Sequence, residues 1–195
     1  MNFVEPIRDR KKIAQIKNLL RGQGRIRDLL LFTVGVNTAL RISDLLRLQI
    51  GQFLDDRGRY KNRFWIHEHK RNKRHEVVIN QSIRAAIEEY LKAYPGVAKN
   101  SEHFVFFNTK TNGYFEPIKR GRAWKFIVSI CHEVGLPGNF GTHSLRKTWG
   151  YHARMQGVDL ALIMHKLNHE SIAYTKRYLG ITDDELEAVA QRLNL

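Results

Sequence analysis

Apolar residues recur along most of this chain at intervals of three and four, which places them on one face of a helix. Residues 9–20 give the clearest example, with isoleucines and leucines on one face and lysines and arginines on the other. A short helix is indicated where Ser43 and Asp44 follow a turn at residues 37–40. The same periodicity predicts helices over residues 25–36, 82–93, 122–134, 144–155, 159–167, 171–179 and 183–193.

Two runs of β-branched and aromatic residues, 64–66 and 77–79, interrupt the helical pattern. The strongly basic stretch between them indicates that the two runs form a β-hairpin. A further apolar run at residues 104–107 is a candidate strand. The expected fold class is therefore mainly α with a small antiparallel β-sheet or hairpin (α+β), and nothing in the pattern indicates a parallel sheet.

Composition and charge narrow the classes of function. The chain has 195 residues, which suits one domain, and its 33 Lys and Arg against 19 Asp and Glu give a formal net charge of +14. This excess of positive charge indicates a polyanionic partner, in particular a nucleic acid. Charge by itself fits a merely basic protein equally well. The one cysteine, Cys131, excludes an internal disulfide and a cysteine-cluster zinc site and fits a reducing cytoplasm. No apolar stretch approaches the roughly 20 residues that span a bilayer.

Three separated stretches carry side chains suited to attack on a phosphodiester. The first contains Arg41. The second contains His143 and Arg146, which lie three residues apart and share a helix face. The third contains His169 and Tyr178. A guanidinium grips phosphate oxygens bidentately and keeps its charge, histidine exchanges a proton near pH 7, and tyrosine can form a covalent phosphate ester.

The motifs Arg-Ile-Ser-Asp-Leu, His-x-x-Arg and His-x8-Tyr, in this order, resemble the catalytic domain of the tyrosine recombinases, also called the phage integrase family. Each motif alone is weak, but the 23 residues from Arg146 to His169 and the nine from His169 to Tyr178 are the family's intervals. The resemblance implies the tyrosine recombinase catalytic-domain fold. It also implies a site-specific DNA recombinase or integrase that cleaves and rejoins DNA through a 3′-phosphotyrosyl intermediate. The alternatives are a type IB topoisomerase-like or hairpin-resolvase activity, or a catalytically silent DNA-binding protein.

The resemblance assigns catalytic roles to the two arginines and the two histidines. Arg41 and Arg146 match the arginines that clamp the phosphate. His143 matches the general acid or base, and His169 matches a hydrogen-bond donor to the phosphate. Neither histidine has the HExxH spacing of a zinc site, so no metal and no other cofactor is implied.

The third stretch departs from the family pattern at two positions. Asn168 replaces the usual glycine before His169, and asparagine is the next-best residue for the left-handed conformation that ends a helix. Tyr174 stands where small hydroxyl residues are usual. It lies four residues before Tyr178 on the same helix face, so geometry alone does not separate the two tyrosines. The family spacing selects Tyr178 as the nucleophile.

Two residues near the motifs have structural as well as functional interpretations. Asp44 stands where the family has an acidic residue that orients an active-site group, and a helix-capping role fits it equally well. Thr142 is expected to cap the helix that begins near His143, whose positive N-terminus would face the phosphate.

The family's catalytic lysine lies in the turn of a β-hairpin, and the turn here reads HKRNKR over residues 69–74. Lys70 aligns with the lysine that protonates the 5′-hydroxyl leaving group. Lys73 is the alternative, because both glycines that flank the family's lysine are replaced. The basic turn could also contact only the DNA backbone. The candidate DNA-binding residues, for which a solvated basic face is the alternative, are Arg71, Lys73, Arg74, Lys119, Arg120 and Arg122.

The resemblance also implies partners and domain organisation. It implies double-stranded DNA as a partner, a homotetramer on two DNA sites, and no membrane. An amphipathic tail helix over residues 183–195 is expected to pass to a neighbouring subunit, the alternative being that it folds back on its own domain. Residues 1–195 are expected to form a single catalytic domain without the N-terminal core-binding domain of larger members, either naturally or as a fragment.

Overall fold

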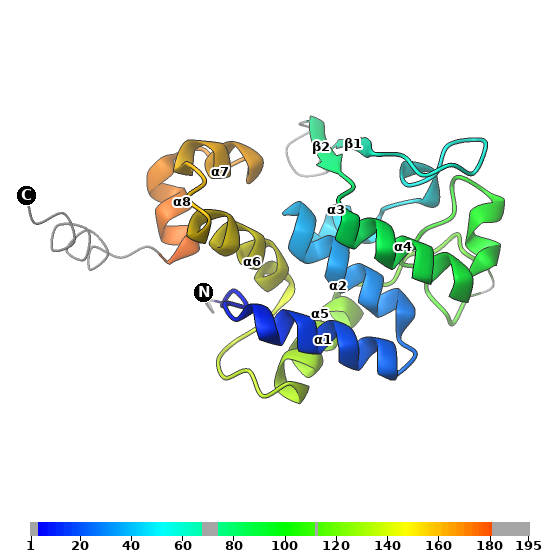
Figure 1. The fold of residues 1–195 in the computed structure, drawn as a ribbon, viewed down its shortest axis with the longest axis horizontal. Coiled ribbons are helices and arrows are strands. Elements are labelled where there is room, and N and C mark those ends of the chain that lie inside the picture. Colours follow the sequence, from blue (N-terminus) through cyan, green and yellow to red (C-terminus); the bar gives the residue numbers. More distant parts are fainter. Residues whose placement is uncertain (1–3, 68–73, 112, 181–195) are drawn as a thin grey trace, which may run out of the picture.

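The computed structural model describes residues 4–67, 74–111 and 113–180 of the chain. These residues form eight α-helices, two short 3₁₀ helices and one two-stranded antiparallel sheet (Figure 1), which confirms the predicted fold class. Among the described residues, no helix combines the length and the apolar character that crossing a membrane requires. The elements are α1 (Arg10–Gly22), α2 (Ile26–Thr38), α3 (Ile42–Leu46), η1 (Ile50–Gln52), β1 (Arg63–His67), β2 (Arg74–Val78), α4 (Gln81–Ala93), η2 (Pro95–Lys99), α5 (Arg120–Glu133), α6 (Thr142–Met155), α7 (Leu160–Lys166) and α8 (Ile172–Leu179).

Side-chain caps fix where several helices begin. The Asp9 carboxylate accepts a hydrogen bond from a backbone N–H in the first turn of α1 at 2.7 Å, and Asn80 does the same for α4 at 3.0 Å. Asp159 and Ser171 cap α7 and α8 in the same way. Each cap satisfies a donor that has no partner inside its helix. The helices predicted before residue 180 are all present, with ends within two residues of the expected positions.

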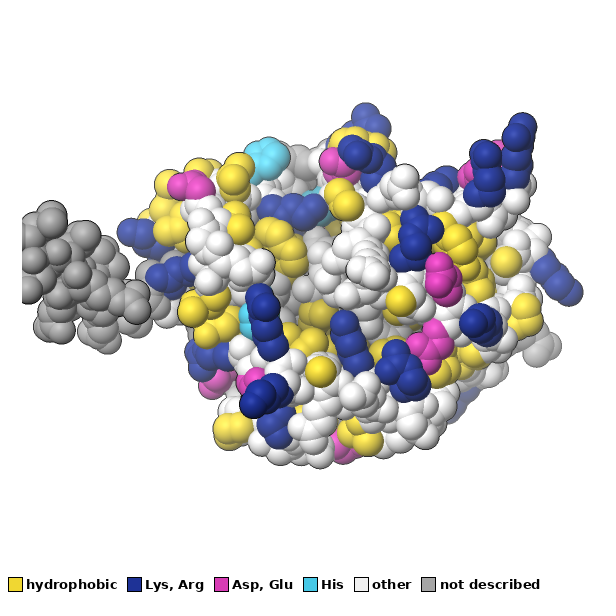
Figure 2. All heavy atoms as spheres, in the orientation of Figure 1, with side chains coloured by type: hydrophobic (Ala, Val, Ile, Leu, Met, Phe, Trp, Pro, Cys, Tyr) yellow, Lys and Arg dark blue, Asp and Glu magenta, His cyan; other side chains and the backbone are white. Residues whose placement is uncertain are grey.

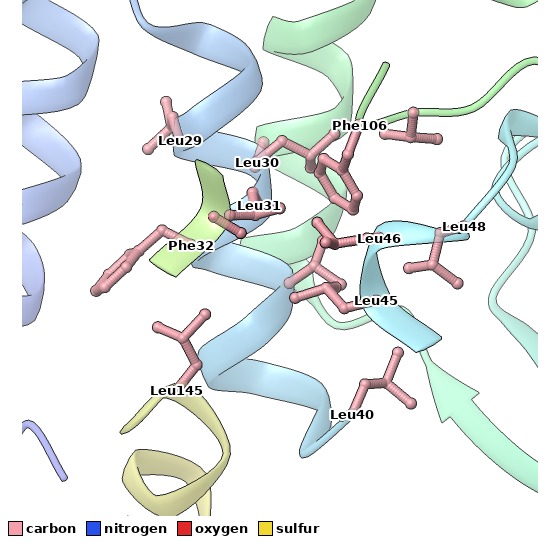
Figure 3. Close-up of a cluster of buried hydrophobic side chains, with 14 of the residues drawn as sticks. Leu29, Leu30, Leu31, Phe32, Leu40, Leu45, Leu46, Leu48, Phe106 and Leu145 are labelled. Carbon is pink, nitrogen blue, oxygen red and sulfur yellow. The ribbon is translucent and has the colours of Figure 1, made fainter. Parts of the chain in front are cut away.

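Helix α2 lies at the centre of the main hydrophobic core and packs against α1, α4 and α6. Its leucines at 29–31 and Phe32 are almost completely buried, and Leu145 of α6 belongs to the same cluster (Figure 3). Gly35 makes this packing possible, because a Cβ there would lie 2.5 Å from Cδ1 of Leu145. The core therefore fixes the N-terminal half of α6, which carries the second motif.

A second, smaller hydrophobic cluster joins the C-terminal half of α6 to α7 and α8. In Figure 1, α7 and α8 lie at one end of the molecule, next to α6 and away from α1 and α4. Because α6 contributes to both clusters, it connects the two parts of the structure. The smaller cluster contains Ala39, Ala153, Ile163, Leu167 and Leu179, with Trp149, Leu160 and Tyr178 packed against it.

Strands β1 and β2 form the expected antiparallel hairpin, in which Arg63 pairs with Val78 and His67 with Arg74. Phe64 and Ile66 point into the core, and Arg63, Trp65 and His67 alternate with them and point outward. The hairpin prediction is confirmed, and the turn at 68–73 lies outside the described residues.

The strand predicted at residues 104–107 is wrong. These residues form only isolated bridges, Phe104 with Gln49 and Phe107 with Pro117. Their apolar character reflects burial in the main core, where Val105 and Phe106 are fully covered. A short apolar run is therefore as compatible with a buried connection as with a strand.

Candidate active site

The second motif begins helix α6. Gly141 has an extended backbone and precedes the helix, and its N–H donates to the Ser144 hydroxyl at 3.0 Å. The prediction that Thr142 caps this helix is wrong, because Thr142 is already its first helical residue. Helical spacing then places His143 and Arg146 one turn apart.

Arg146 is 2% exposed, and its guanidinium joins the three motif stretches. Nη1 donates to the carbonyl of Ala39, and Nη2 donates to the carbonyl of Leu167. Ala39 lies two residues before Arg41, and Leu167 lies two residues before His169. A guanidinium has five N–H donors, so these two carbonyls do not exhaust its capacity. Arg146 therefore fixes the spacing between the other two stretches and can also bind an anion.

Arg41 directly precedes α3 and is half-buried. The backbone immediately before it is constrained, because Ala39 ends α2 in the left-handed region at φ 60°. Asp44 is 6% exposed and lies in the first turn of α3, after the residue that occupies the capping position. The capping interpretation of Asp44 is therefore wrong, and its orienting role stays a prediction.

The third motif places a histidine between two tyrosines. The His169 ring lies 4.7 Å from the Tyr174 ring and 4.8 Å from the Tyr178 ring, centroid to centroid, and meets both edge-on. His169 Nδ1 lies 3.1 Å from the Thr175 hydroxyl, which itself donates to the carbonyl of Ser171 at 3.0 Å. The hydroxyl has one proton, so it accepts from Nδ1–H of His169.

Backbone and burial distinguish the residues of this third stretch. Asn168 adopts φ 47°, which confirms the left-handed turn expected before His169. The Tyr174 side chain is 53% exposed. Tyr178 is half-buried as a residue, and its hydroxyl oxygen is fully buried.

Charges on the motif residues affect one another's pKa values, so these residues lie near one another. Burial raises the pKa of Tyr178 to about 12, and the positive charges of Arg146 and Arg41 act in the opposite direction. The pKa of His143 is lowered, mainly by loss of hydration and then by four nearby cations. His143 is exposed at the surface, so we attribute much of this shift to the cations. They are Arg120, Arg146, Lys147 and Arg41, in order of decreasing effect.

The hairpin packs against the third motif stretch. Lys166, at the end of α7, donates from Nζ to the carbonyl of Glu76 on β2 at 2.7 Å. Arg74, which begins β2, covers the Trp65 ring at 4.1 Å from its centroid. Lys70, Arg71 and Lys73 lie outside the described residues.

The remaining candidate DNA-binding residues surround the start of α5. Lys119, Arg120 and Arg122 are all exposed, and Arg120 is the one whose charge acts on His143. Figure 2 shows Lys and Arg side chains spread over the visible face of the molecule, with few Asp and Glu among them. Within the described ranges, no group of three or more His, Cys, Asp or Glu side chains could hold a metal ion.

One residue of the site was missed at the sequence level. Lys147 on α6 is 4% exposed, and its Nζ lies 5.0 Å from the centroid of the Tyr178 ring. The available signal was its position four residues after His143, which places both side chains on the same face of α6.

Comparison with known proteins agrees with this fold. The sequence model of the phage integrase family matches residues 9–185. The probable integrase/recombinase YoeC of Bacillus subtilis is 36% identical over 188 residues, which cover 96% of this chain and 96% of YoeC. The tyrosine recombinase XerD of Corynebacterium glutamicum is 28% identical over 165 residues, which cover 84% of this chain and 51% of XerD.

Solved structures share the fold at lower sequence identity. The crystal structure of XerA recombinase aligns with a TM-score of 0.74 and 18% identity over 98% of this chain and 66% of that chain. XerH recombinase, in a post-cleavage complex with palindromic difH substrate, aligns with a TM-score of 0.70 and 20% identity over 99% of this chain and 54% of that chain. The chain thus spans nearly all of YoeC and about half to two thirds of these Xer proteins.

The fold and the site define a tyrosine recombinase catalytic domain. The chain belongs to the phage integrase family, whose members cleave and rejoin DNA in site-specific recombination.

Proposed function

We propose that this chain recombines double-stranded DNA at a specific site, with Tyr178 as the nucleophile and a 3′-phosphotyrosyl intermediate. The observation that carries the proposal is the Arg146 guanidinium, which binds the backbone next to Arg41 and next to His169. This contact supports a common site for the three motif stretches that contain Arg41, His143 with Arg146, and His169 with Tyr178. Related structures of XerH bound to DNA support the choice of DNA as substrate.

The cleavage step is a transesterification. The Tyr178 oxygen forms a bond to phosphorus while the bond from phosphorus to the 5′ oxygen breaks, which releases a 5′-hydroxyl. The phenol proton must leave, and His143 suits the role of base because its lowered pKa keeps the imidazole neutral at pH 7. Lys70 is proposed as the acid that protonates the 5′ oxygen.

Arg41, Arg146 and His169 are proposed to stabilise the charge that develops on the phosphate oxygens, an effect usually worth several kcal/mol. The contact with Thr175 restricts how His169 can donate a hydrogen bond to the phosphate. Because Nδ1 carries a proton toward Thr175, Nε2 can donate to a phosphate oxygen only when the ring is an imidazolium. The negative charge of a bound phosphodiester would favour that charged form.

The phosphotyrosyl ester keeps the energy of the broken bond, so a 5′-hydroxyl from a partner strand can reverse the reaction without ATP. We propose that Arg71, Lys73, Arg74, Lys119, Arg120 and Arg122 contact the DNA backbone. The exposed positions of the four among them that are described fit this role.

The wider organisation is also a proposal. We take residues 1–195 as one catalytic domain, because α6 contributes to both hydrophobic clusters. Recombination is proposed to occur in a tetramer on two DNA sites, with the tail at 183–195 docked on a neighbour. Deleting this tail should leave DNA binding intact and abolish assembly on paired sites, measured by native gel electrophoresis. Equal assembly by the truncated chain would assign the tail to its own domain.

The nucleophile can be tested with covalent capture. The wild-type protein is incubated with random duplexes, attached DNA is recovered, and the selected sequence is rebuilt as a nicked duplex that traps the covalent complex. Tyr178→Phe should abolish the protein–DNA adduct and retain binding, because the phenol oxygen is the attacking atom. The matched variant Tyr174→Phe should still form the adduct. An adduct with Tyr178→Phe but none with Tyr174→Phe would reassign the nucleophile.

A further inference from the structure

Lys147 is a charged side chain in an unusual place. It lies on α6 directly after Arg146 and is 4% exposed, although an ammonium ion loses much of its hydration energy when it is buried. Its Nζ lies 5.0 Å from the centroid of the Tyr178 ring, within the range of a cation–π interaction. Removing water from such a pair strengthens it, so burial favours this contact even though it disfavours the isolated charge.

The other charged groups around Lys147 come from the N-terminal segment 4–9, which lies along α6. Ile7 is completely buried, its N–H donates to Thr148 at 2.8 Å, and its carbonyl lies 3.0 Å from His152 Nε2. This anchorage brings Glu5 and Arg8 near the ammonium. Burial and then the charge of Arg8 lower the pKa of Lys147, Glu5 raises it, and together they bring it to about 8. The lysine therefore lies near both the N-terminal segment and the ring of Tyr178.

Several polar groups surround the Tyr178 side chain: His169 lies at the ring edge, Lys147 lies over the ring face, and Arg146 acts on the phenol. The Tyr174 ring stacks on it at 6.3 Å between centroids. The residue after Tyr178, Leu179, packs against Gly150 of α6, where a Cβ would lie 2.6 Å from Leu179 Cδ2. Helix α8 thus approaches α6 closely at this point. The orientation of the phenol then depends on which groups contact the ring.

We propose that Lys147 is a positioning residue that holds the ring of Tyr178 against α6 through its ammonium group. This inference rests on the proposed role of Tyr178 as nucleophile, and it adds a cation that positions the tyrosine ring. In this role the ammonium acts through Tyr178. It sets where the tyrosine oxygen lies before cleavage.

The test compares two substitutions at position 147 with a control at position 148. Lys147→Met keeps the length and the apolar stem and removes the charge, and Lys147→Arg keeps the charge. Thr148→Val loosens the N-terminal segment, because it removes the hydroxyl that accepts from Ile7, and it leaves the charge over Tyr178 in place. Thermal unfolding checks that each variant folds.

The first measurement needs no DNA. The burial of the Tyr178 phenol is followed at pH 7, where Lys147 is mostly charged, by NMR with tyrosine labelled at ¹³Cζ and a soluble paramagnetic probe, and Tyr178→Phe assigns the resonance. If Lys147 holds the ring in its buried position, Lys147→Met exposes the phenol, and the probe broadens its resonance more strongly than in the wild type. Lys147→Arg and Thr148→Val should keep the wild-type broadening. Unchanged broadening in Lys147→Met would overturn the proposal, as would an equal increase in Thr148→Val.

The second measurement uses the nicked duplex recovered by covalent capture. Lys147→Met should bind it like the wild type and form the adduct about tenfold more slowly, the size of effect that a desolvated cation–π contact supports. Lys147→Arg should restore the rate. Wild-type rates in Lys147→Met would overturn the positioning role. Failure of the proposed nucleophile would instead appear as an adduct in Tyr178→Phe, and the NMR result would still decide the role of Lys147.

Discussion

Arg146 contributes to the fold and is also a candidate for the chemistry. Its guanidinium satisfies two buried carbonyls in different motif stretches, and it is proposed to bind phosphate as well. Arg146→Ala leaves both carbonyls without that donor, so we expect a loss of about 3 kcal/mol in the free energy of unfolding. Arg146→Lys keeps the charge but not the planar fork, and should fold better than the alanine variant while cleaving no DNA.

Urea unfolding checks the stability part of this prediction. Arg57→Ala, which removes an exposed arginine in a loop, is the control and should change stability by less than about 0.5 kcal/mol. Equal stability of Arg146→Ala and the control would mean that the two carbonyl contacts contribute nothing.

The titration of Lys147 should make the free energy of unfolding increase with pH. Its pKa in the folded protein is about 8, below its ordinary value of 10.5, so the folded state releases this proton first as the pH rises. The burial penalty therefore acts fully below pH 8 and is relieved between pH 8 and 10.5. Stability should rise relative to Lys147→Met across this window, by up to about 3 kcal/mol. Urea unfolding at pH 7 to 10 measures it, and parallel curves for the two proteins would contradict the assigned pKa.

At the residue scale, order and spacing in the motifs were enough to choose Arg41, Arg146 and Tyr178 as candidates. The structure places these residues close together, and their catalytic roles stay predictions. The motifs gave no guide to residues whose place depends on tertiary burial. Nothing in the periodicity marks Lys147 as buried, and the cap expected at Thr142 is replaced by a contact with Ser144.

At the scale of elements, periodicity located helices such as α1 and α4 because each buries a single apolar stripe. The short run at 104–107 was misread because burial alone does not specify backbone pairing. The packing of α8 against α6 could not be predicted from the sequence, because it depends on contacts between residues distant in sequence. Gly150 is the contact that allows it.

Gly150→Ala tests this packing. The added methyl would meet Leu179, so we expect a destabilisation of about 1 to 3 kcal/mol confined to the contact between α6 and α8. Hydrogen exchange in α7 and α8 should accelerate, and α2 and α4 should stay protected. Gly22→Ala near the end of α1 is the matched control, because nothing lies within 4 Å of its added Cβ. Unchanged exchange in α8 would show that Leu179 adjusts at no cost.

The whole molecule acts on DNA through its net charge of +14. Binding to a short duplex should weaken steeply with salt, by a slope of about −0.9 in log K against log salt for each phosphate contacted. Replacing Lys119 and Arg122 by glutamine should reduce the slope by about two, measured by fluorescence anisotropy. The same change at Lys92 and Lys99, exposed residues of α4 and η2, should leave the slope nearly unchanged. Equal effects of the two pairs would point to a diffuse basic surface.

The two hydrophobic clusters have a consequence for how the enzyme responds to heat. The cluster that holds α7 and α8 contains five buried side chains, far fewer than the main core, so it should open first on warming. Because Tyr178 lies on α8, DNA cleavage would stop while α1, α2 and α4 remain folded, and it would return on cooling. A recombinase built in this way has a working temperature set by its smallest core.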